Sequence, residues 1–485
     1  LLERLQYRLS LFRIFFSRIN GVLSRLPKGD NIVVNHELDT IDDFNTMSVQ
    51  TAVLKNSFTA ILAMLMVLIY NVADTFFIGQ THDALQVAAV SLATPVFLLF
   101  MAVGTVFGVG GTSVISRALG AGRQAYAKQV CSFCMWCCVV VGVLLSVLLW
   151  LGMDKIILLI GASSDTFDLV KTYLNIVTFF GPFVLIGNCY SNILRAEGQS
   201  TKATMGMLVG NLLNVILDPI MIIGLNWNIA GAAIATVIGN VVGALYYLLY
   251  FAQGKSSLSI NPKDFTMGDK VAYGVLSIGI PASLGSLLMS VSAIVLNSQM
   301  TEYGDMALAG IGVAAKVTMI TGMVCIGLGQ GVQPLLGYSV GAGNWSRYRE
   351  IMHISILLAF GLGVVMTGLC YIFVERIVGA FLTDKNALAY GIMFSKIFLT
   401  TSVLFGVFYV LVNALQALGA AFSSLIINIS RQGLIYIPVL LFLKKTWGIQ
   451  GLVWAQPVTD VLSLVLVFIL YYKSSSYRTS YQLQN

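Results

Sequence analysis

Asn211-Leu-Leu-Asn214-Val-Ile-Leu-Asp218-Pro219 lies inside an apolar run, from about residue 203 to residue 224, that is long enough to cross a bilayer as a helix. Asn211, Asn214 and Asp218 are spaced i, i+3 and i+7, so on a helix they form one polar stripe. A carboxylate at membrane depth costs roughly 3 kcal/mol on insertion scales and more in simulations. Because such a group normally faces a cavity or a partner, the stripe is a candidate functional site.

Pro219 adds a second feature to this stripe. It has no N–H, so on a helix the carbonyl of Val215 loses its hydrogen-bond partner. An Asn amide, the carboxylate of Asp218 and a freed carbonyl on adjacent turns predict an oxygen-rich site for a proton or a small hard cation. The alternative is a kinked helix whose polar stripe only holds neighbouring helices together.

The composition of the chain excludes a soluble protein. Of its 485 residues, 57% are hydrophobic and only 10% are charged, with a mean hydropathy of +0.86, whereas soluble domains carry about 25% charged residues. We therefore expect an all-α membrane protein with twelve transmembrane helices. The twelve apolar stretches lie near 52–78, 87–116, 130–151, 169–194, 202–224, 230–252, 272–299, 307–337, 350–374, 388–413, 420–443 and 449–472.

Lysine and arginine predict the orientation of these helices. One set of joints carries Arg117, Arg123, Lys128, Arg195, Lys202, Lys255, Lys263, Lys270, Arg347 and Arg349. The opposite set carries only Lys155, Lys171, Arg376, Lys385, Lys444 and Lys445. The positive-inside rule places the first set and both basic termini in the cytoplasm, as expected for a multi-pass protein of the plasma (inner) membrane. The basic residues form no single stripe, so the net charge of +7 reflects topology and we expect no nucleic-acid partner.

The chain contains an internal repeat with a constant offset of 221 residues. This offset carries 88–122 onto 309–343, and Asn192-Ile-Leu-Arg-Ala-Glu-Gly198 onto Asn413-Ala-Leu-Gln-Ala-Leu-Gly419. Two parallel six-helix bundles around a central cavity are a transporter plan. The expected parts are a basic amphipathic arm and linker (1–50), an N-lobe (51–252), a cytoplasmic linker (253–271), a C-lobe (272–473) and a cytoplasmic tail (474–485).

Motifs of cofactor-dependent enzymes are missing from the sequence. The glycines at 108–111 lack the strand-and-helix context of a dinucleotide loop, and there is no Walker loop. We expect neither an enzyme nor a cofactor. Four cysteines (Cys131, Cys134, Cys137 and Cys138) cluster without a nearby His, and we interpret them as small core residues rather than metal ligands.

The two halves differ in their charged residues. The first half has Asp74 near the outer end of its first helix, where it is either an interfacial residue or the partner of Asp218. We expect no acid deep in the helices of the second half, which carries Lys316 and Arg431 instead. These two cations either bind carbonyls at helix ends, or act as cavity charges that contact an anionic substrate group.

The chain resembles members of the multidrug and toxic compound extrusion (MATE) family. The similarity rests on two parallel six-helix halves, D-T-F-F-I-G at 74–79, G-A-G at 120–122 and 341–343, and L-R-A-E-G-Q at 194–199 before N-x-x-N-x-x-x-D-P. It covers about residues 50–473. The resemblance implies secondary active efflux of organic, mainly cationic and amphipathic compounds, driven by inward flow of H+ or Na+.

The resemblance also implies the site residues. Asp74, Asn214, Asp218 and Thr236 match the N-lobe set that couples transport to H+ or Na+, with Asn211 as a secondary candidate. Family members with a second-lobe cation site carry acids that this sequence lacks in its seventh and tenth helices, so coupling through the first lobe is expected. Drugs and the lipid bilayer are the expected partners, and a monomer is the expected state.

Two other functions stay open at the level of sequence. A lipid-linked oligosaccharide flippase of the same wider superfamily would need a strongly cationic cavity, for which Lys316 and Arg431 are modest support. A membrane scaffold or receptor would leave the internal duplication and the buried Asp218 without a purpose.

Overall fold

The computed structural model describes residues 47–81, 83–268, 270–382 and 384–482. Most of the predicted amphipathic arm at 1–50 therefore lies outside the described residues. The described part of the first half contains α3 (Val49–Gly79), α4 (Ala84–Gly120), α5 (Gln124–Leu151), α6 (Met153–Leu159), α7 (Ser164–Phe179), α8 (Gly181–Ala196), α9 (Ser200–Asp218), the π-helix η1 (Pro219–Gly224) and α10 (Asn228–Ala252).

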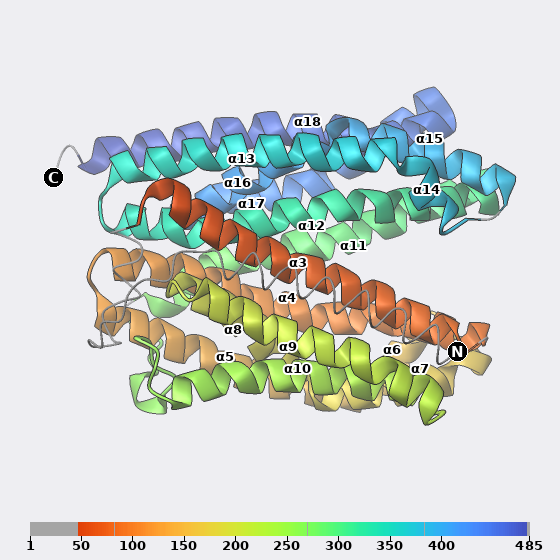
Figure 1. Ribbon diagram of the computed structural model, residues 1–485, viewed down its shortest axis with the longest axis horizontal. Helices are drawn as coiled ribbons and strands as arrows, with labels where there is room; N and C mark the ends of the chain where they lie inside the picture. The colour runs from red at the N-terminus through yellow and green to blue at the C-terminus, as the bar shows by residue number, and fades with distance from the viewer. Residues whose placement is uncertain (1–46, 82, 269, 383, 483–485) are drawn as a thin grey trace, which may run out of the picture. The chain divides into compact units, whose positions relative to one another are not determined.

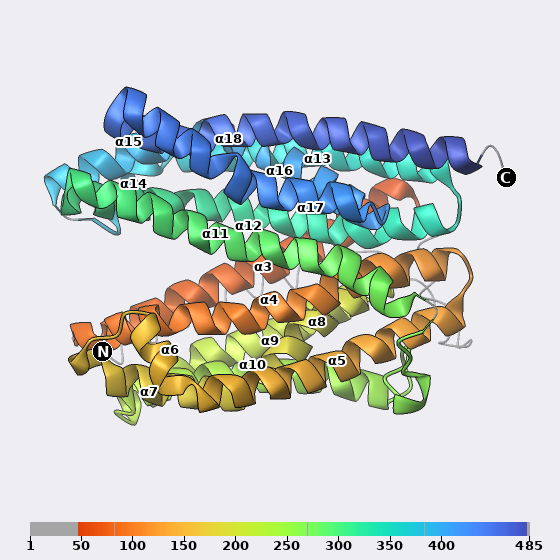
Figure 2. The ribbon, with the colours of Figure 1, turned by 180° about the vertical axis from the view of Figure 1, so that it is seen from behind.

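The second half repeats this order after a short linker. It contains the 3₁₀ turn η2 (Pro262–Asp264), α11 (Val271–Met300), η3 (Thr301–Tyr303), α12 (Asp305–Gly341), α13 (Trp345–Ile372), α14 (Val374–Gly379), α15 (Lys385–Ser402), α16 (Phe405–Ala417), α17 (Ala421–Ile429), the π-helix η4 (Ser430–Leu434) and α18 (Tyr436–Gln482). Figures 1 and 2 show α5 to α10 gathered on one side and α13 to α18 on the other.

The predicted spans correspond to long apolar helices. Among the described residues, nine helices are long and apolar enough to cross a membrane, or up to eleven if each of two bent pairs is one span. The bent pairs are α7 with α8 (56°) and α15 with α16 (48°). The longest candidate, Ala421–Ser475, contains the last two predicted spans and breaks between them at Gly448, whose φ is 59°. The all-α membrane fold is confirmed, and the count of twelve holds approximately.

The two halves meet through α3 and α4 on one side and α11 and α12 on the other. Glycines allow these helices to touch backbone to backbone. A Cβ on Gly279 of α11 would lie 1.8 Å from the carbonyl oxygen of Val106, and one on Gly110 of α4 would lie 2.1 Å from that of Val275. These contacts bring the two halves into direct backbone contact along α4 and α11.

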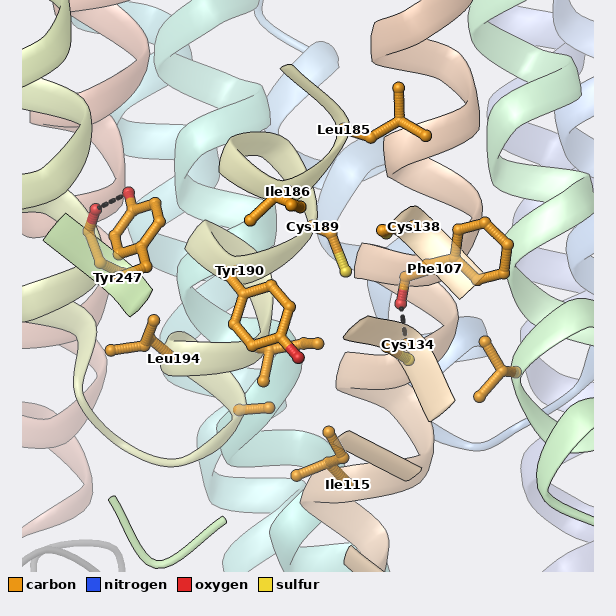
Figure 3. Close-up of a cluster of buried hydrophobic side chains, with 14 of the residues drawn as sticks. Phe107, Ile115, Cys134, Cys138, Leu185, Ile186, Cys189, Tyr190, Leu194 and Tyr247 are labelled. Carbon is orange, nitrogen blue, oxygen red and sulfur yellow. Dashed lines mark hydrogen bonds between the residues drawn. The ribbon is translucent and has the colours of Figure 1, made fainter. Parts of the chain in front are cut away.

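Figure 3 shows part of the core of the first half, where the cysteines pack among aliphatic and aromatic side chains. The Cys134 thiol donates to the carbonyl of Phe107 at 3.5 Å. The hydroxyl of Tyr190 donates to the carbonyl of Cys131 at 3.0 Å. Of the four cysteines, Cys131, Cys134 and Cys138 are buried core residues as predicted, and Cys137 is half-buried against the same core.

The linker between the halves is held against the first half near the start of α5 and the end of α8. The hydroxyl of Ser132 donates to the carbonyl of Asn261 at 2.7 Å. Glu197, just after α8, accepts from the hydroxyls of Ser256 at 2.7 Å and Ser257 at 2.9 Å. Burial raises the pKa of Glu197, and these hydrogen bonds oppose that effect only in part.

Candidate functional site

The predicted polar stripe and the next helix form one buried cluster. Asn214 and Asp218 lie on α9 and Thr236 on α10, with exposures of 3%, 0% and 6%. The Asn214 amide nitrogen lies 3.4 Å from both the Asp218 carboxylate and the Thr236 hydroxyl. The oxygen of the Asn214 amide and the second Asp218 oxygen accept no hydrogen bond. The cluster therefore offers unsatisfied oxygens at membrane depth.

Two glycines bring α9 and α10 close enough for this contact. A Cβ on Gly210 or on Gly239 would lie 2.6 Å from the carbonyl oxygen of the other residue. A Cβ on Gly239 would also lie 3.1 Å from the Cβ of Asn214. The absence of both side chains lets Asn214 reach across to Thr236.

Pro219 begins a π-helix, which the sequence did not predict. The sequence offered a freed carbonyl at Val215 or, as the alternative, a plain kink, whereas the chain continues from α9 into the π-helix η1. Its wider turn is closed by the amide of Leu225, which donates to Ile220 at 2.8 Å. π-Helical turns are frequent at functional sites, and this one starts directly after Asp218.

Asp74 lies on α3 and is half-buried. One of its carboxylate oxygens is shielded from solvent and has no hydrogen-bond partner. α3 packs against α9, and Asp74 is close enough to Asp218 for their two charges to repel each other. None of the ion pairs among the described residues involves either acid. The two carboxyls thus share one region and lack a basic partner there.

Tyr173 is a member of this region that the sequence did not indicate. It lies on α7 with an exposure of 5%, and its side chain lies close to Thr236. It also interacts electrostatically with Asp74 and Asp218. A tyrosine in an apolar helix is ordinarily a core residue, so only the packing of α7 against α10 reveals this position.

A central cavity of about 340 Å³ lies beside the cluster and is lined by both halves. Its apolar wall includes methionines from five helices, and its polar wall includes several amides. Asn214 and Thr236 belong to both the cavity and the cluster. Asn211 also lines the cavity, and its amide nitrogen has no hydrogen-bond partner.

The second half contains a buried acid, so the prediction of no acid deep in its helices was wrong. Asp460 lies on α18 with an exposure of 4%, inside the last predicted span. It accepts from Nε and Nη2 of Arg431 at 3.2 and 3.0 Å, and from the Gln456 amide at 3.0 Å. The acid was visible in the apolar stretch 449–472, but only packing shows its partner.

Arg431 and Lys316 do not line the central cavity described above. Arg431 is buried between Asp460 and the rings of Phe405, Phe408 and Tyr409, at 4.6 to 5.5 Å from their centroids. Lys316 is exposed on α12, with Nζ 5.2 Å from the ring centroid of Phe381. Each cation has a local partner that the sequence did not suggest.

Comparison with known proteins gives matches over most of the chain. The family model MatE matches twice, over residues 59–220 and 281–442. Multidrug export protein MepA of Staphylococcus aureus is 31% identical over 433 residues, covering 88% of this chain and 95% of MepA. MepA of Staphylococcus haemolyticus is 30% identical, covering 88% and 94%.

Solved structures share the fold. A structure described as the outward-facing conformation of a multidrug resistance MATE family transporter of the MOP superfamily has a TM-score of 0.86, 22% identity, and coverage of 91% of this chain and 99% of its own. A MOP superfamily transporter from Pyrococcus furiosus has a TM-score of 0.84, 22% identity, and coverage of 91% and 98%. With the apolar helices, these matches identify a multi-pass membrane protein.

Proposed function

The chain belongs to the MatE family, and from that premise we propose that it is a secondary active multidrug exporter. It exchanges organic, mainly cationic and amphipathic compounds for H+ or Na+ bound in the N-lobe. The coupling residues are Asp74, Asn214, Asp218 and Thr236, with Asn211 in a secondary role. We retain the predicted lobe boundaries, cytoplasmic termini and monomeric state as parts of this proposal.

The observation that supports the proposal most is the pair of unsatisfied oxygens on Asn214 and Asp218. A buried carboxylate without a counter-charge is strongly disfavoured, and a bound proton or Na+ removes that cost. Carboxylate, amide and hydroxyl oxygens suit a small hard cation as well as a proton. Asp74 and Tyr173 add two further oxygens in the same region.

Residues that belong to both the cluster and the cavity would couple cation binding to drug release. Asn214 and Thr236 line the cavity, and Asn214 also contacts Asp218. When a cation neutralises the acids, the helix pair α9 and α10 can close water away from them at lower cost. A cation and a drug affect each other only through their different affinities for the two conformations. Cation binding from outside would therefore favour the shape that releases the drug.

The cavity fits varied apolar compounds. Met64, Met101, Met289 and Met323 come from α3, α4, α11 and α12. Methionine side chains repack around ligands of different shape. A volume of about 340 Å³ lies within the ~300–1,000 Å³ typical of small-molecule sites.

The test is drug export by purified protein in liposomes, with an imposed pH or Na+ gradient. Asp218→Asn and Asp74→Asn should each lower coupled export at least ~10-fold, which corresponds to about 1.4 kcal/mol. Asp168→Asn, an exposed acid on α7, is the matched control and should leave export unchanged. Full export by both site variants would refute the assignment. A sodium-free assay across a pH gradient decides between H+ and Na+.

A lipid-linked oligosaccharide flippase needs a strongly cationic cavity. Lys316 and Arg431 lie outside the cavity, and among the described residues Arg195 is the one cation that lines it. A scaffold or receptor role likewise has no observation in its favour.

A further inference from the structure

We propose that Arg195 is a receptor for the carboxylate of zwitterionic aromatic drugs, at the end of the central cavity remote from Asp218. This rests on the proposed export function and assigns the residue that determines whether the cavity prefers substrates with an anionic group.

Arg195 was expected in a cytoplasmic joint, but it is buried. It lies in the last turn of α8 with an exposure of 1%. Its contacts are long and weak: Nη1 lies 3.5 Å from the Asn192 amide oxygen, and Nη2 lies 3.4 Å from the sulfur of Met207. Nε has no partner. No ion pair among the described residues includes Arg195, and nearby Glu197 binds Ser256 and Ser257 instead.

A buried guanidinium of this kind needs a compensating anion. Burying an isolated charge is strongly unfavourable, even after relaxation. The position of Arg195 near a helix C-terminus offsets only a small part of this cost. Arg431 shows how this chain satisfies a buried guanidinium for structural reasons alone, with a carboxylate at 3.0 Å and three aromatic rings. Arg195 lies near the neutral hydroxyl of Tyr247 but has no carboxylate partner among the described residues, so an anionic ligand is the missing partner.

Arg195 opens onto the central cavity and is the one charged side chain among the described residues that line it. The neighbouring wall offers amides from Asn188, Asn192, Asn211 and Asn240. A guanidinium with nearby amides matches a carboxylate, which it can bind through two parallel hydrogen bonds. The cavity therefore recognises an anionic group although the proposed substrates are cations.

The spacing of the two ends defines the substrate class. Met207, which contacts Arg195, and Asp218 are both on α9, eleven residues apart. At 1.5 Å per residue they are separated by about 16 Å along the helix, and Met207 and Asn214 by about 10 Å. An aromatic molecule with its ammonium group beside Asn214 and its carboxylate on Arg195 spans this distance. Compounds with only a cationic group would leave Arg195 unused.

The test uses tetramethylrhodamine, which has a free carboxylate, and its methyl ester, which has the same ring system and none. Binding of each dye to the purified full chain in detergent is measured by fluorescence polarisation. We expect the wild type to bind both dyes. Arg195→Gln should weaken binding of the free acid at least ~10-fold and that of the ester less than ~2-fold, while Arg195→Lys keeps part of the preference. Lys202→Gln, an exposed cation on α9, should change neither.

If a folded Arg195→Gln protein loses binding of both dyes equally, Arg195 has a structural role and the proposal is overturned. Unchanged binding of both dyes would overturn it as well. Wild-type binding of the ester without the free acid would overturn it too, while leaving the export function intact. Failure of the wild type to bind or export either dye would count against the proposed function instead. If Arg195→Gln does not fold, competition in the wild type decides: benzoate should displace the free acid, and neutral benzamide should not.

Discussion

Arg431 donates from Nε and Nη2 to a single oxygen of Asp460 at a helix crossing where the first half has only glycines. The repeat offset of 221 residues relates Arg431 to Gly210 and Asp460 to Gly239. Those two glycines touch each other between α9 and α10. At this helix crossing, the second half therefore has an ion pair between η4 and α18. The first half has direct backbone contact between α9 and α10.

The presence of this ion pair in only one half indicates different roles for the two halves. An acid with a permanent guanidinium partner can bind a cation only by giving up that pair, and breaking a buried pair costs about 3–5 kcal/mol. Asp218 has no such partner among the described residues. The asymmetry supports a coupling site in the first lobe and a fixed, structural charge pair in the second.

The ion pair should contribute to stability and not to coupling. Asp460→Asn leaves Arg431 buried without its counter-charge, so we expect a loss of about 3–5 kcal/mol in the free energy of unfolding. Thermal unfolding of the purified protein in detergent measures this. Replacing both residues by apolar ones, Arg431→Met with Asp460→Leu, should recover the stability and retain export. A stable Asp460→Asn protein that exports nothing would contradict this assignment.

The glycine contact should be necessary for the cation site. Gly210→Ala places a methyl group 2.6 Å from the carbonyl oxygen of Gly239, which forces α9 and α10 apart. Such overpacking costs about 1–3 kcal/mol and separates Asn214 from Thr236. We expect weaker binding of the coupling cation, measured as a higher cation concentration for half-maximal export.

The matched control for this variant is Gly312→Ala on α12. A Cβ there meets nothing within 4 Å, so export should stay as in the wild type and stability should not fall. Unchanged cation dependence in Gly210→Ala would mean that the contact between Asn214 and Thr236 has no part in coupling.

The sequence could predict what depends on local periodicity. The i, i+3, i+7 spacing places Asn214 and Asp218 on one face of α9, and the structure joins them. The apolar runs predicted the membrane-spanning helices, because the thickness of a bilayer sets the minimum length of such a helix. By contrast, the π-helix at Pro219 depends on which carbonyls the neighbouring turns can satisfy, and a lone proline predicts a kink equally well.

Contacts between distant helices were beyond such reasoning. Tyr173 reaches Thr236 only because α7 packs on α10. Arg195 ends an apolar run and was counted among the joint residues, although it is buried where α8 packs on α9. Asp460 was present in its apolar stretch, but its pairing with Arg431 is a property of packing.

Glu197 gives a prediction about pH. Burial raises its pKa from the ordinary 4.5, so the folded protein holds this proton more tightly than the unfolded chain does. Stability linked to Glu197 is therefore greatest below the unfolded pKa and falls as pH rises through the folded pKa. Glu197→Gln removes the charge and keeps an oxygen that can accept from Ser256 and Ser257.

Glu197→Gln should accordingly unfold at a higher temperature than the wild type at about pH 8, with the difference shrinking towards about pH 4. Differential scanning fluorimetry of both proteins across this range measures it, and the exposed Glu350→Gln on α13 serves as the control that should show no such trend. If Glu197→Gln is instead less stable at about pH 8, the hydrogen bonds from the linker serines outweigh burial. The ionised carboxylate would then be what holds the linker to the N-lobe.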